Sequence, residues 1–325
     1  MKSYYGLSVI GAFKLTLGLT ILGFVLWLVD WGQAIEVAGH ADAKWLVIAF
    51  ACLLLSFIPA AMRWAGLLRA LGISYLRVAC YRVYLIGAFY SLAMPGVIGG
   101  DAARVFFCQR ETLAPLALVA GTVLMERGLG ALAMITLLSL GLYVYPEELL
   151  GIDFAWAPGF ALLLLVFVAS LPLVWRALPL NKLQIVALED GKWQKRFKTF
   201  LEQLAPFTRM RALHLLGALG LSFLFQALDI LATFAIAKGL GLEVSIWMLL
   251  VAMPVVFLAT VLPISPAGLG VREGTLVVVL TQFGLSAPEA ALLAVAVFLN
   301  KVAVGLVGAA QHFAGGKGAL SESDH

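Results

Sequence analysis

Charged residues are scarce in this sequence. Only 12% of its 325 residues are charged and 62% are hydrophobic, with a mean hydropathy of +1.01. A soluble domain carries about 25% charged and about 45–50% apolar residues. The composition therefore excludes a disordered chain, a disulfide scaffold and an ordinary cytosolic enzyme. It predicts an all-α, polytopic membrane protein.

The residues of common catalytic and metal sites are also few. The three cysteines (Cys52, Cys80 and Cys108) form no CxxC or zinc pattern, and the four histidines fit no HExxH spacing. The sequence contains no GxSxG motif, Walker A motif or Rossmann fingerprint. We therefore expect no cofactor, no metal and no enzymatic activity. The alternative is a membrane-embedded transferase in which one buried aspartate acts as a base.

Six apolar runs are long enough to cross about 30 Å of hydrocarbon at ~1.5 Å per residue. The predicted spans are 12–29, 45–62, 116–144, 158–175, 212–237 and 288–312. The first resembles a signal peptide, but no small-residue cleavage site lies close behind it, so we predict an uncleaved span. We expect residues 1–325 to form a single integral membrane domain, with a first half (1–175) and a second half (212–325).

Two further apolar runs, 79–94 and 245–262, each end in a Gly/Pro-rich motif that is followed by charged residues. Short, interrupted segments at corresponding places in two halves are typical of transporters built from inverted repeats. We therefore predict two re-entrant helical hairpins. In the alternative, each arm is a full span and a surface loop joins the two. The motifs are Pro95-Gly96-Val97-Ile98-Gly99-Gly100 and Pro263-Ile264-Ser265-Pro266-Ala267-Gly268-Leu269-Gly270.

Two predicted loops, 63–82 and 176–211, carry most of the basic residues outside the spans. On the opposite side, Lys44 and Lys238 are the only basic residues of the loops. The positive-inside rule then places both termini in the cytoplasm and the protein in the cytoplasmic (inner) membrane. With this topology the two hairpins enter the membrane from opposite sides. The basic residues of the first loop are Arg63, Arg69, Arg77 and Arg82.

The linker 176–211 contains an amphipathic stretch at 190–206. Aromatic and aliphatic residues follow one helical face of this stretch, and lysines and arginines follow the other. We predict a cytoplasmic helix that lies on the anionic membrane surface. The alternative is a soluble amphipathic helix that packs beneath the bundle. No nucleic-acid-binding module is visible, so nucleic acid is not an expected partner.

Several polar residues lie within the predicted spans or beside the Gly/Pro motifs. We therefore expect them at membrane depth. Each charge there costs at least about 2.5–3.5 kcal/mol, so each needs a partner or a wet site. Glu126 and Arg127 cannot pair with each other, because neighbours do not face each other on a helix. Structural ion pairs are the alternative to a functional site. The residues are Asp101, Arg104, Glu126, Arg127, Asp229, Arg272, Glu273, Asn300 and Lys301.

Helical spacing places some of these residues on defined faces. Asp229 belongs to a polar stripe on 212–237, which we expect to face the interior. Lys301 shares a face with two glycines that would let another helix approach closely. Asp101 follows two glycines, so it is either an N-cap or part of an anion site with Arg104. The two stripes are Ser222, Gln226, Asp229 and Thr233, and Lys301, Gly305, Gly308 and His312.

Four motifs together give the sequence a resemblance to a known family. They are Arg82-x4-Gly87-x-Phe89, Pro95-Gly96-x-x-Gly99-Gly100-Asp101-x-x-Arg104, Glu126-Arg127 and Pro263-x-Ser265-Pro266-x-Gly268-x-Gly270-x-Arg272-Glu273-Gly274. The sequence resembles the lysylphosphatidylglycerol synthase transmembrane-region family, also called the flippase-like domain family, over nearly its whole length.

The resemblance implies an integral cytoplasmic-membrane domain linked to lipid translocation. In the multiple-peptide-resistance proteins this domain precedes a soluble aminoacyl transferase domain and is proposed to move an aminoacylated phospholipid outward. Here only about a dozen residues follow the last predicted span. We therefore expect no transferase domain and do not carry over lysyl transfer.

The favoured hypothesis is a lipid flippase or transporter for a phosphate-bearing lipid, such as a phospholipid, glycolipid or polyprenyl phosphate. Its bases would neutralise the head group, and its acids would hold those bases in the empty site or carry a coupling proton. One alternative is a membrane scaffold or regulatory subunit that docks a lipid-modifying enzyme through 176–211. Less favoured is a lipid head-group transferase. The expected partners are membrane lipids, with a homodimer through Gly121 and Gly128 as one option.

Overall fold

The computed structural model describes residues 9–29, 31–93, 99–144, 210–261 and 268–321, with Gly159, Leu162, Leu163 and Ser265. Within these residues the secondary structure is helical and no strand occurs. The predicted span 158–175 lies almost entirely outside the described residues, and the amphipathic stretch 190–206 lies wholly outside them. Both therefore stay predictions.

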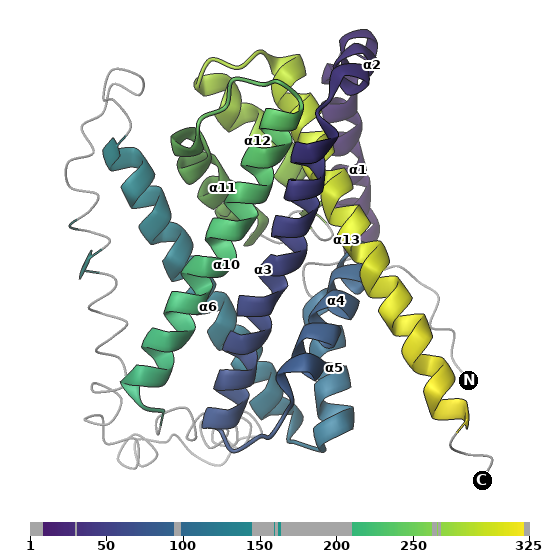
Figure 1. Cartoon of the computed structure of the whole chain (residues 1–325), viewed down its shortest axis with the longest axis vertical. Coiled ribbons are helices and arrows are strands. Elements are labelled where there is room, and N and C mark those ends of the chain that lie inside the picture. The colour runs from purple at the N-terminus through teal and green to yellow at the C-terminus, as the bar shows by residue number, and fades with distance from the viewer. Residues whose placement is uncertain are drawn as a thin grey trace.

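Four long helices, α3 (Ala43–Ala70), α6 (Leu116–Val144), α10 (Ala212–Gly239) and α13 (Ala287–Ser321), form the frame of the molecule (Figure 1). All four are long and apolar enough to cross a membrane. They coincide with four of the predicted spans, and α1 (Val9–Leu28) occupies a fifth. The expectation of a polytopic all-α membrane protein is confirmed.

The first basic loop was placed wrongly by the sequence. Helix α3 does not end near residue 62 but continues to Ala70, so Arg63 and Arg69 are helical. Arg63 is buried, with 7% of its surface exposed. The predicted span 45–62 ends too early because an arginine usually marks the end of an apolar span. Arg63, by contrast, has partners inside the bundle.

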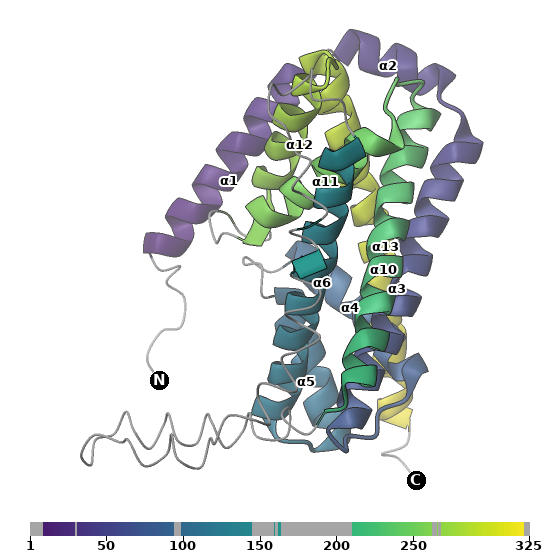
Figure 2. The same ribbon diagram turned by 90° about the vertical axis from the view of Figure 1, so that its left-hand side faces the viewer.

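The described parts of the two halves have the same order of helices, and their first long helices run in opposite directions. Helices α3 and α10 pack side by side and run in opposite directions (Figures 1 and 2). Both end in the same turn, with Gly72 and Gly241 at φ 80° and 67° and their N–H groups donating to Arg69 O and Lys238 O. Such a C-terminal turn needs a left-handed residue, which glycine supplies without strain. Each turn leads into two short helices and then a long one.

The short helices form two pairs, α4 (Arg77–Ala93) with α5 (Gly99–Thr112) and α11 (Ile246–Val261) with α12 (Val271–Gln282). At ~1.5 Å per residue none reaches the 30 Å or so of a hydrocarbon core. The arms of each pair pack against each other, with α4 and α5 in the lower half of Figure 1 and α11 and α12 in the upper half. This geometry favours two hairpins that enter from opposite ends over full spans joined by surface loops.

Glycines allow the first hairpin and α13 to pack closely. A Cβ on Gly100 of α5 would lie 2.5 Å from the carbonyl oxygen of Gly87 on α4. A Cβ on Gly308 of α13 would collide with the backbone carbonyl of Leu85, also on α4. The prediction that the glycine face of the last helix permits a close approach is therefore confirmed, and α4 is the helix that approaches.

The open end of the first hairpin is held by a polar cluster around Glu111 at the end of α5. Its Oε1 accepts from Arg82 Nη2 at 2.7 Å and its Oε2 accepts from Tyr75 Oη at 3.1 Å. Burial and the neighbouring carboxylate raise the pKa of Tyr75 well above its usual value, so this hydroxyl stays a donor. The cluster joins the C-terminal end of α5 to α4 and to the loop that precedes α4.

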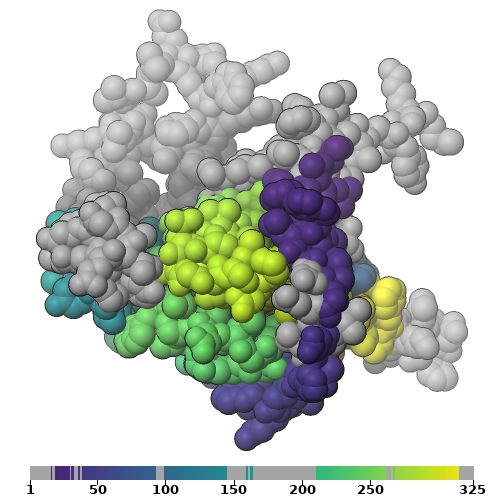
Figure 3. Space-filling view, turned by 90° about the horizontal axis from the view of Figure 1, so that it is seen from above, coloured from purple at the N-terminus to yellow at the C-terminus, as the bar shows by residue number. Residues whose placement is uncertain are grey.

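Apolar side chains fill the space between helices and also cover the outside. One core cluster, around Trp64, lies among α3 to α6, and a larger one lies among α10 to α13 and includes Val25 of α1 and Ala49 of α3. From above, the segment that connects α12 to α13 covers the middle of the upper face between the N-terminal helices and the turn after α10 (Figure 3). Exposed outward residues such as Val47, Leu124 and Leu306 suit a lipid environment.

We predict that Gly308→Ala destabilises the fold, because the added methyl group has no space against the Leu85 carbonyl. The expected cost is about 1–3 kcal/mol or more, the usual range for overpacking. The readout is the thermal unfolding midpoint in detergent.

Gly128→Ala on α6 is the matched control. A Cβ there has no neighbour within 4 Å, and alanine favours a helix over glycine. We expect an unchanged or higher midpoint. An equal decrease in both variants would contradict the close packing of α13 on α4.

Candidate functional site

The first turns of α5 and α12 and the long helices surround a central cavity of about 770 Å³. Both halves contribute to its lining, which comes from α3 to α6 and from α10 to α13. Eight of the nine polar residues singled out from the sequence line it, and Arg63 joins them. The charged lining residues are Arg63, Asp101, Arg104, Glu126, Arg127, Asp229, Arg272, Glu273 and Lys301.

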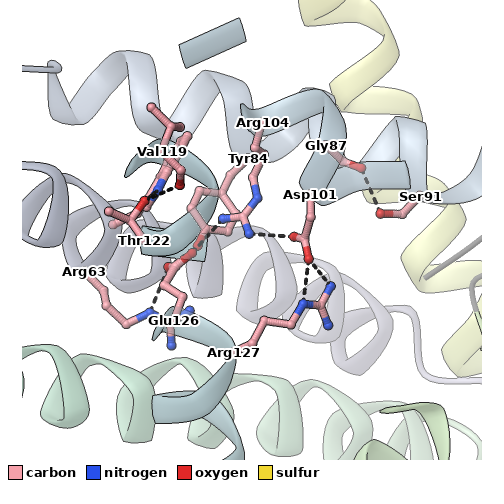
Figure 4. Close-up of polar contacts among 11 residues, drawn as sticks. Arg63, Tyr84, Gly87, Ser91, Asp101, Arg104, Val119, Thr122, Glu126 and Arg127 are labelled. Carbon is pink, nitrogen blue, oxygen red and sulfur yellow. Dashed lines mark hydrogen bonds and ion pairs between the residues drawn. The ribbon is translucent and has the colours of Figure 1, made fainter. Parts of the chain in front are cut away.

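In the first half of the chain, charges of alternating sign form a continuous series (Figure 4). Glu126 Oε1 accepts from Arg63 Nε at 2.9 Å, and Glu126 Oε2 accepts from Arg104 Nη1 at 2.9 Å. Asp101 Oδ1 accepts from Arg104 Nη2 at 2.6 Å, and Asp101 Oδ2 accepts from Arg127 Nε at 2.6 Å. We call the five side chains the ion-pair chain. It links α3, α5 and α6.

The middle of the ion-pair chain is almost fully buried. The side chain of Glu126 is 2% exposed, and that of Arg104 is 7% exposed. The hydroxyl of Tyr84 on α4 also donates to Glu126. The Arg104 guanidinium lies 4.1 Å from the centroid of the Tyr84 ring and 5.2 Å from that of Trp64. Carboxylate and aromatic faces together replace the water that the buried arginine lacks.

The outer ends of the ion-pair chain differ. Arg63 is 7% exposed, and its Nη1 donates to Ser222 Oγ of α10 at 2.8 Å. Arg127 is 43% exposed and borders the cavity. One end of the chain is therefore fixed between helices, and the other faces the cavity.

The second half contributes a sparser set of charges. Lys301 Nζ of α13 lies 3.9 Å from Asp229 Oδ1 of α10. Glu273 is buried in the first turn of α12, and its Oε2 accepts from the backbone N–H of Gly270 at 2.8 Å. Glu273 thus caps its own helix as well as lining the cavity.

The polar stripe on α10 faces the interior, as predicted. Ser222, Gln226 and Thr233 are at most 3% exposed. Ser222 accepts from Arg63, and Gln226 Nε2 donates to the carbonyl of Gly130 at 3.5 Å. The stripe joins α10 to α3 and α6 beside the cavity.

Asn300 is the one candidate that does not line the cavity. Its Nδ2 donates to the backbone carbonyl of Ala49 on α3 at 3.4 Å, so it ties α13 to α3. Its neighbour Lys301 points toward Asp229 because successive helical residues are about 100° apart.

Asp101 lies within the first turn of α5 rather than before it. Its two carboxylate oxygens accept from Arg104 and Arg127. This geometry corresponds to the interpretation of Asp101 as part of a charged site, with arginines as its partners.

The described parts of the Gly/Pro motifs stand at the beginnings of α5 and α12. Gly99 and Gly100 open α5 and are buried, as are Ser265, Gly268 and Gly270 before α12. Gly268 and Gly270 have φ of 71° and 76°, a left-handed conformation that favours glycine. Pro95, Gly96, Pro263 and Pro266 lie outside the described residues.

Sequence reasoning missed Arg63 and Tyr84. The apolar stretch that continues after Arg63, from Trp64 to Leu68, was a signal that the helix extends past the arginine. Tyr84 carried no such signal, because a tyrosine in an apolar run is equally compatible with a membrane interface.

Comparison with known proteins gives a consistent result. The model of the family described as "Lysylphosphatidylglycerol synthase TM region" matches residues 12–308. The chain belongs to this family. Its relatives include UPF0104 membrane proteins of three archaea. That of Pyrococcus horikoshii is 24% identical over 281 residues, which covers 79% of this chain and 82% of the relative.

The other two relatives are similar to the chain over comparable lengths. The UPF0104 membrane protein of Methanocaldococcus jannaschii is 22% identical, covering 80% of this chain and 81% of its own length. That of Methanothermobacter thermautotrophicus is 24% identical, covering 85% and 86%. The family resemblance stated from the four motifs is confirmed.

We predict that Glu126→Gln destabilises the protein more than Arg63→Met does. Removing one partner of a buried ion pair costs about 3–5 kcal/mol. In Glu126→Gln two buried arginines lose their shared carboxylate and repel each other. In Arg63→Met the carboxylate keeps Arg104 and Tyr84.

The thermal unfolding midpoints of both variants in detergent measure this difference. Equal midpoints, or a larger loss in Arg63→Met, would show that Glu126 is not the shared partner of the two arginines.

Proposed function

We propose that the protein is a lipid flippase or transporter that moves a phosphate-bearing lipid across the membrane. The observation that carries the proposal is the central cavity, in which charged side chains gather beside the first turns of α5 and α12. Interrupted helices that meet at a binding site are the arrangement found in many transporters. The family membership adds a link to membrane lipids.

The cavity has the two surfaces that a lipid requires. Its charged residues include five bases, of which four are assigned to a phosphate. Much of the remaining lining is apolar and aromatic, from Phe57, Phe225, Phe257, Phe298 and their neighbours. A head group would bind among the charges, and acyl or prenyl chains would lie against apolar surface or in lipid. The bases assigned to the head group are Arg104, Arg127, Arg272 and Lys301.

The acids would hold these bases while the site is empty. Asp101 and Glu126 already do so for Arg104. Asp229 is the acid placed to hold Lys301, and either could exchange a proton as the cavity fills and empties. Transport would then be passive or coupled to an ion.

Surface charge supports a placement in the cytoplasmic (inner) membrane with the lower end of Figure 1 in the cytoplasm. Exposed arginines lie at the lower ends of α3, α4, α5 and α10. Four exposed acids lie at the upper end, together with Lys44 and Lys238, whereas Glu111 is the exposed acid beside the lower-end arginines. By the positive-inside rule the first hairpin would enter from the cytoplasm and the second from the opposite side. The lower-end arginines are Arg69, Arg77, Arg110 and Arg211, and the upper-end acids are Glu36, Asp42, Glu243 and Glu289.

Translocation of a fluorescent phospholipid in proteoliposomes tests the proposal. We expect the wild type to move the lipid and Arg272→Ala and Glu126→Ala each to slow it by about tenfold or more, since each loses a charged interaction in the cavity. Arg110→Ala, at the exposed end of α5, is the matched control and should keep the wild-type rate. Wild-type rates in both cavity variants would contradict the roles assigned here.

Two other outcomes would point to the alternative functions. A soluble enzyme that co-purifies in stoichiometric amount, and is lost when the basic residues of 176–211 are neutralised, would indicate a scaffold. A new lipid product made by the purified protein alone would indicate a head-group transferase.

A further inference from the structure

We propose that Asp229 and Lys301 form a proton-coupling site. When a head-group phosphate binds at Lys301, the Asp229 carboxylate releases the ammonium group and takes up one proton. When the phosphate leaves, Asp229 returns that proton to water and pairs with Lys301 again. This inference rests on the proposed function and deepens it by naming the coupling ion and the residues that carry it.

The pair of Asp229 and Lys301 is held loosely. Asp229 Oδ1 lies 3.9 Å from Lys301 Nζ, which is beyond the ordinary range of a hydrogen bond. The two ion pairs of Arg104 measure 2.6 and 2.9 Å by comparison. A contact without a hydrogen bond loses less energy when its partners separate, so a phosphate can replace Asp229 beside Lys301.

Both side chains of the pair have the depth and the exposure that proton exchange requires. Lys301 lies at the middle of the candidate span Ala287–Ala314, and Asp229 lies within α10. The side chains of Lys301 and Asp229 are 25% and 14% exposed, and both line the cavity. Water that enters the cavity can therefore reach them. Ionisable residues in such positions are typical of proton relays.

The other acids of the described cavity lining have structural roles. Asp101 and Glu126 each accept from two arginines at 2.5–2.9 Å, and an arginine does not release its proton. Glu273 is 2% exposed, and its Oε2 accepts from the backbone N–H of Gly270 at the beginning of α12. Protonation of any of these acids would weaken a contact that holds a helix in place. Asp229 is therefore the acid to which we assign the exchangeable proton.

Phosphate binding and proton uptake favour each other at this pair. A phosphate at Lys301 brings a negative charge beside the Asp229 carboxylate. Two anions repel each other strongly in a low dielectric, and one proton on Asp229 removes this repulsion. A protonated Asp229 in turn leaves Lys301 to the phosphate, so binding becomes tighter as the pH falls. One negative charge and one proton thus enter the cavity together.

The remaining charged and titratable groups of the described lining surround the pair. Arg272 and Glu273 of α12 act electrostatically on Lys301. Helix α11 contributes no charged residue. Arginines stay charged throughout the biological pH range, so they set a constant field around the pair. The other groups, from α3 to α6, are Arg63, Tyr84, Asp101, Arg104, Glu126 and Arg127.

The pH dependence of lipid binding tests the inference. The probe is fluorescent phosphatidylglycerol in detergent, because its phosphodiester keeps one negative charge from mildly acidic to mildly alkaline pH. Uptake of one proton per lipid changes the affinity by up to about tenfold per pH unit. Within that bound, we expect wild-type binding to tighten by about threefold or more for each unit by which the pH falls.

Asp229→Asn imitates the protonated acid. This variant should bind at every pH with the affinity that the wild type reaches at low pH, and misfolding cannot produce such a gain at alkaline pH. Lys301→Gln should bind about tenfold or more weakly and without pH dependence, because it removes the base for which phosphate and Asp229 compete. Glu243→Gln removes an exposed acid after α10 and is the matched control, which should follow the wild type.

Four results would overturn the proton-coupling site. They are a wild-type affinity that does not change with pH, a wild-type pH dependence in Asp229→Asn, a loss of binding in Asp229→Asn at every pH, and a pH dependence that persists in Lys301→Gln. The Lys301→Gln result decides the question even where Asp229→Asn does not fold.

Transport separates this inference from the proposed function. In proteoliposomes, fluorescent phosphatidylglycerol should move from the acidic side to the alkaline side, and Asp229→Asn should exchange it in both directions without a response to the gradient. Binding linked to pH without translocation would overturn the proposed function but not the proton uptake at Asp229. Translocation that still follows the gradient in Asp229→Asn would overturn the proton-coupling site alone.

A soluble competitor identifies the source of the phosphate. Glycerophosphoglycerol has the same head group without acyl chains, and it should not displace the lipid at equal concentration. Displacement would show that a soluble phosphodiester is the ligand and would overturn the assignment to a lipid.

Discussion

The structure depends on one carboxylate that two buried arginines share. Glu126 joins α6 to Arg63 of α3 and to Arg104 of α5, and it also accepts from Tyr84 of α4. Four helices, α3 to α6, therefore meet at this side chain. In a low dielectric such a group is stable only when every partner is in place, so its presence fixes how the first hairpin sits in the bundle.

The inverted arrangement explains why a cavity exists beside this centre. Both long helices, α3 and α10, end in the same glycine turn, and both are followed by arms too short to cross the membrane. The pair α4 and α5 lies in the lower half of the bundle and the pair α11 and α12 in the upper half (Figure 1). The first turns of α5 and α12, with their charged residues, then border one cavity.

The two halves have the same order of helices but differ in how closely their charged side chains are paired. The first half holds its charges in tight pairs at 2.5–2.9 Å. In the second half Lys301 and Asp229 are 3.9 Å apart, and Glu273 caps its own helix. The charged side chains are therefore tightly paired on one side of the cavity and more loosely paired on the other. An amphipathic ligand that exchanges partners with these groups fits such a site.

The sequence by itself determined the membrane class, four described spans, the interruption of two further apolar runs, the family and eight of the nine cavity candidates. These follow from apolar run length, Gly/Pro interruption and the cost of charge at membrane depth, which are all local properties. Only the tertiary structure decided which charges pair, that Arg63 belongs to the bundle, that Tyr84 contacts Glu126 and that Asn300 faces α3. Such facts depend on which helices become neighbours, because a residue's partner lies on another helix and the spacing within its own helix does not reveal it.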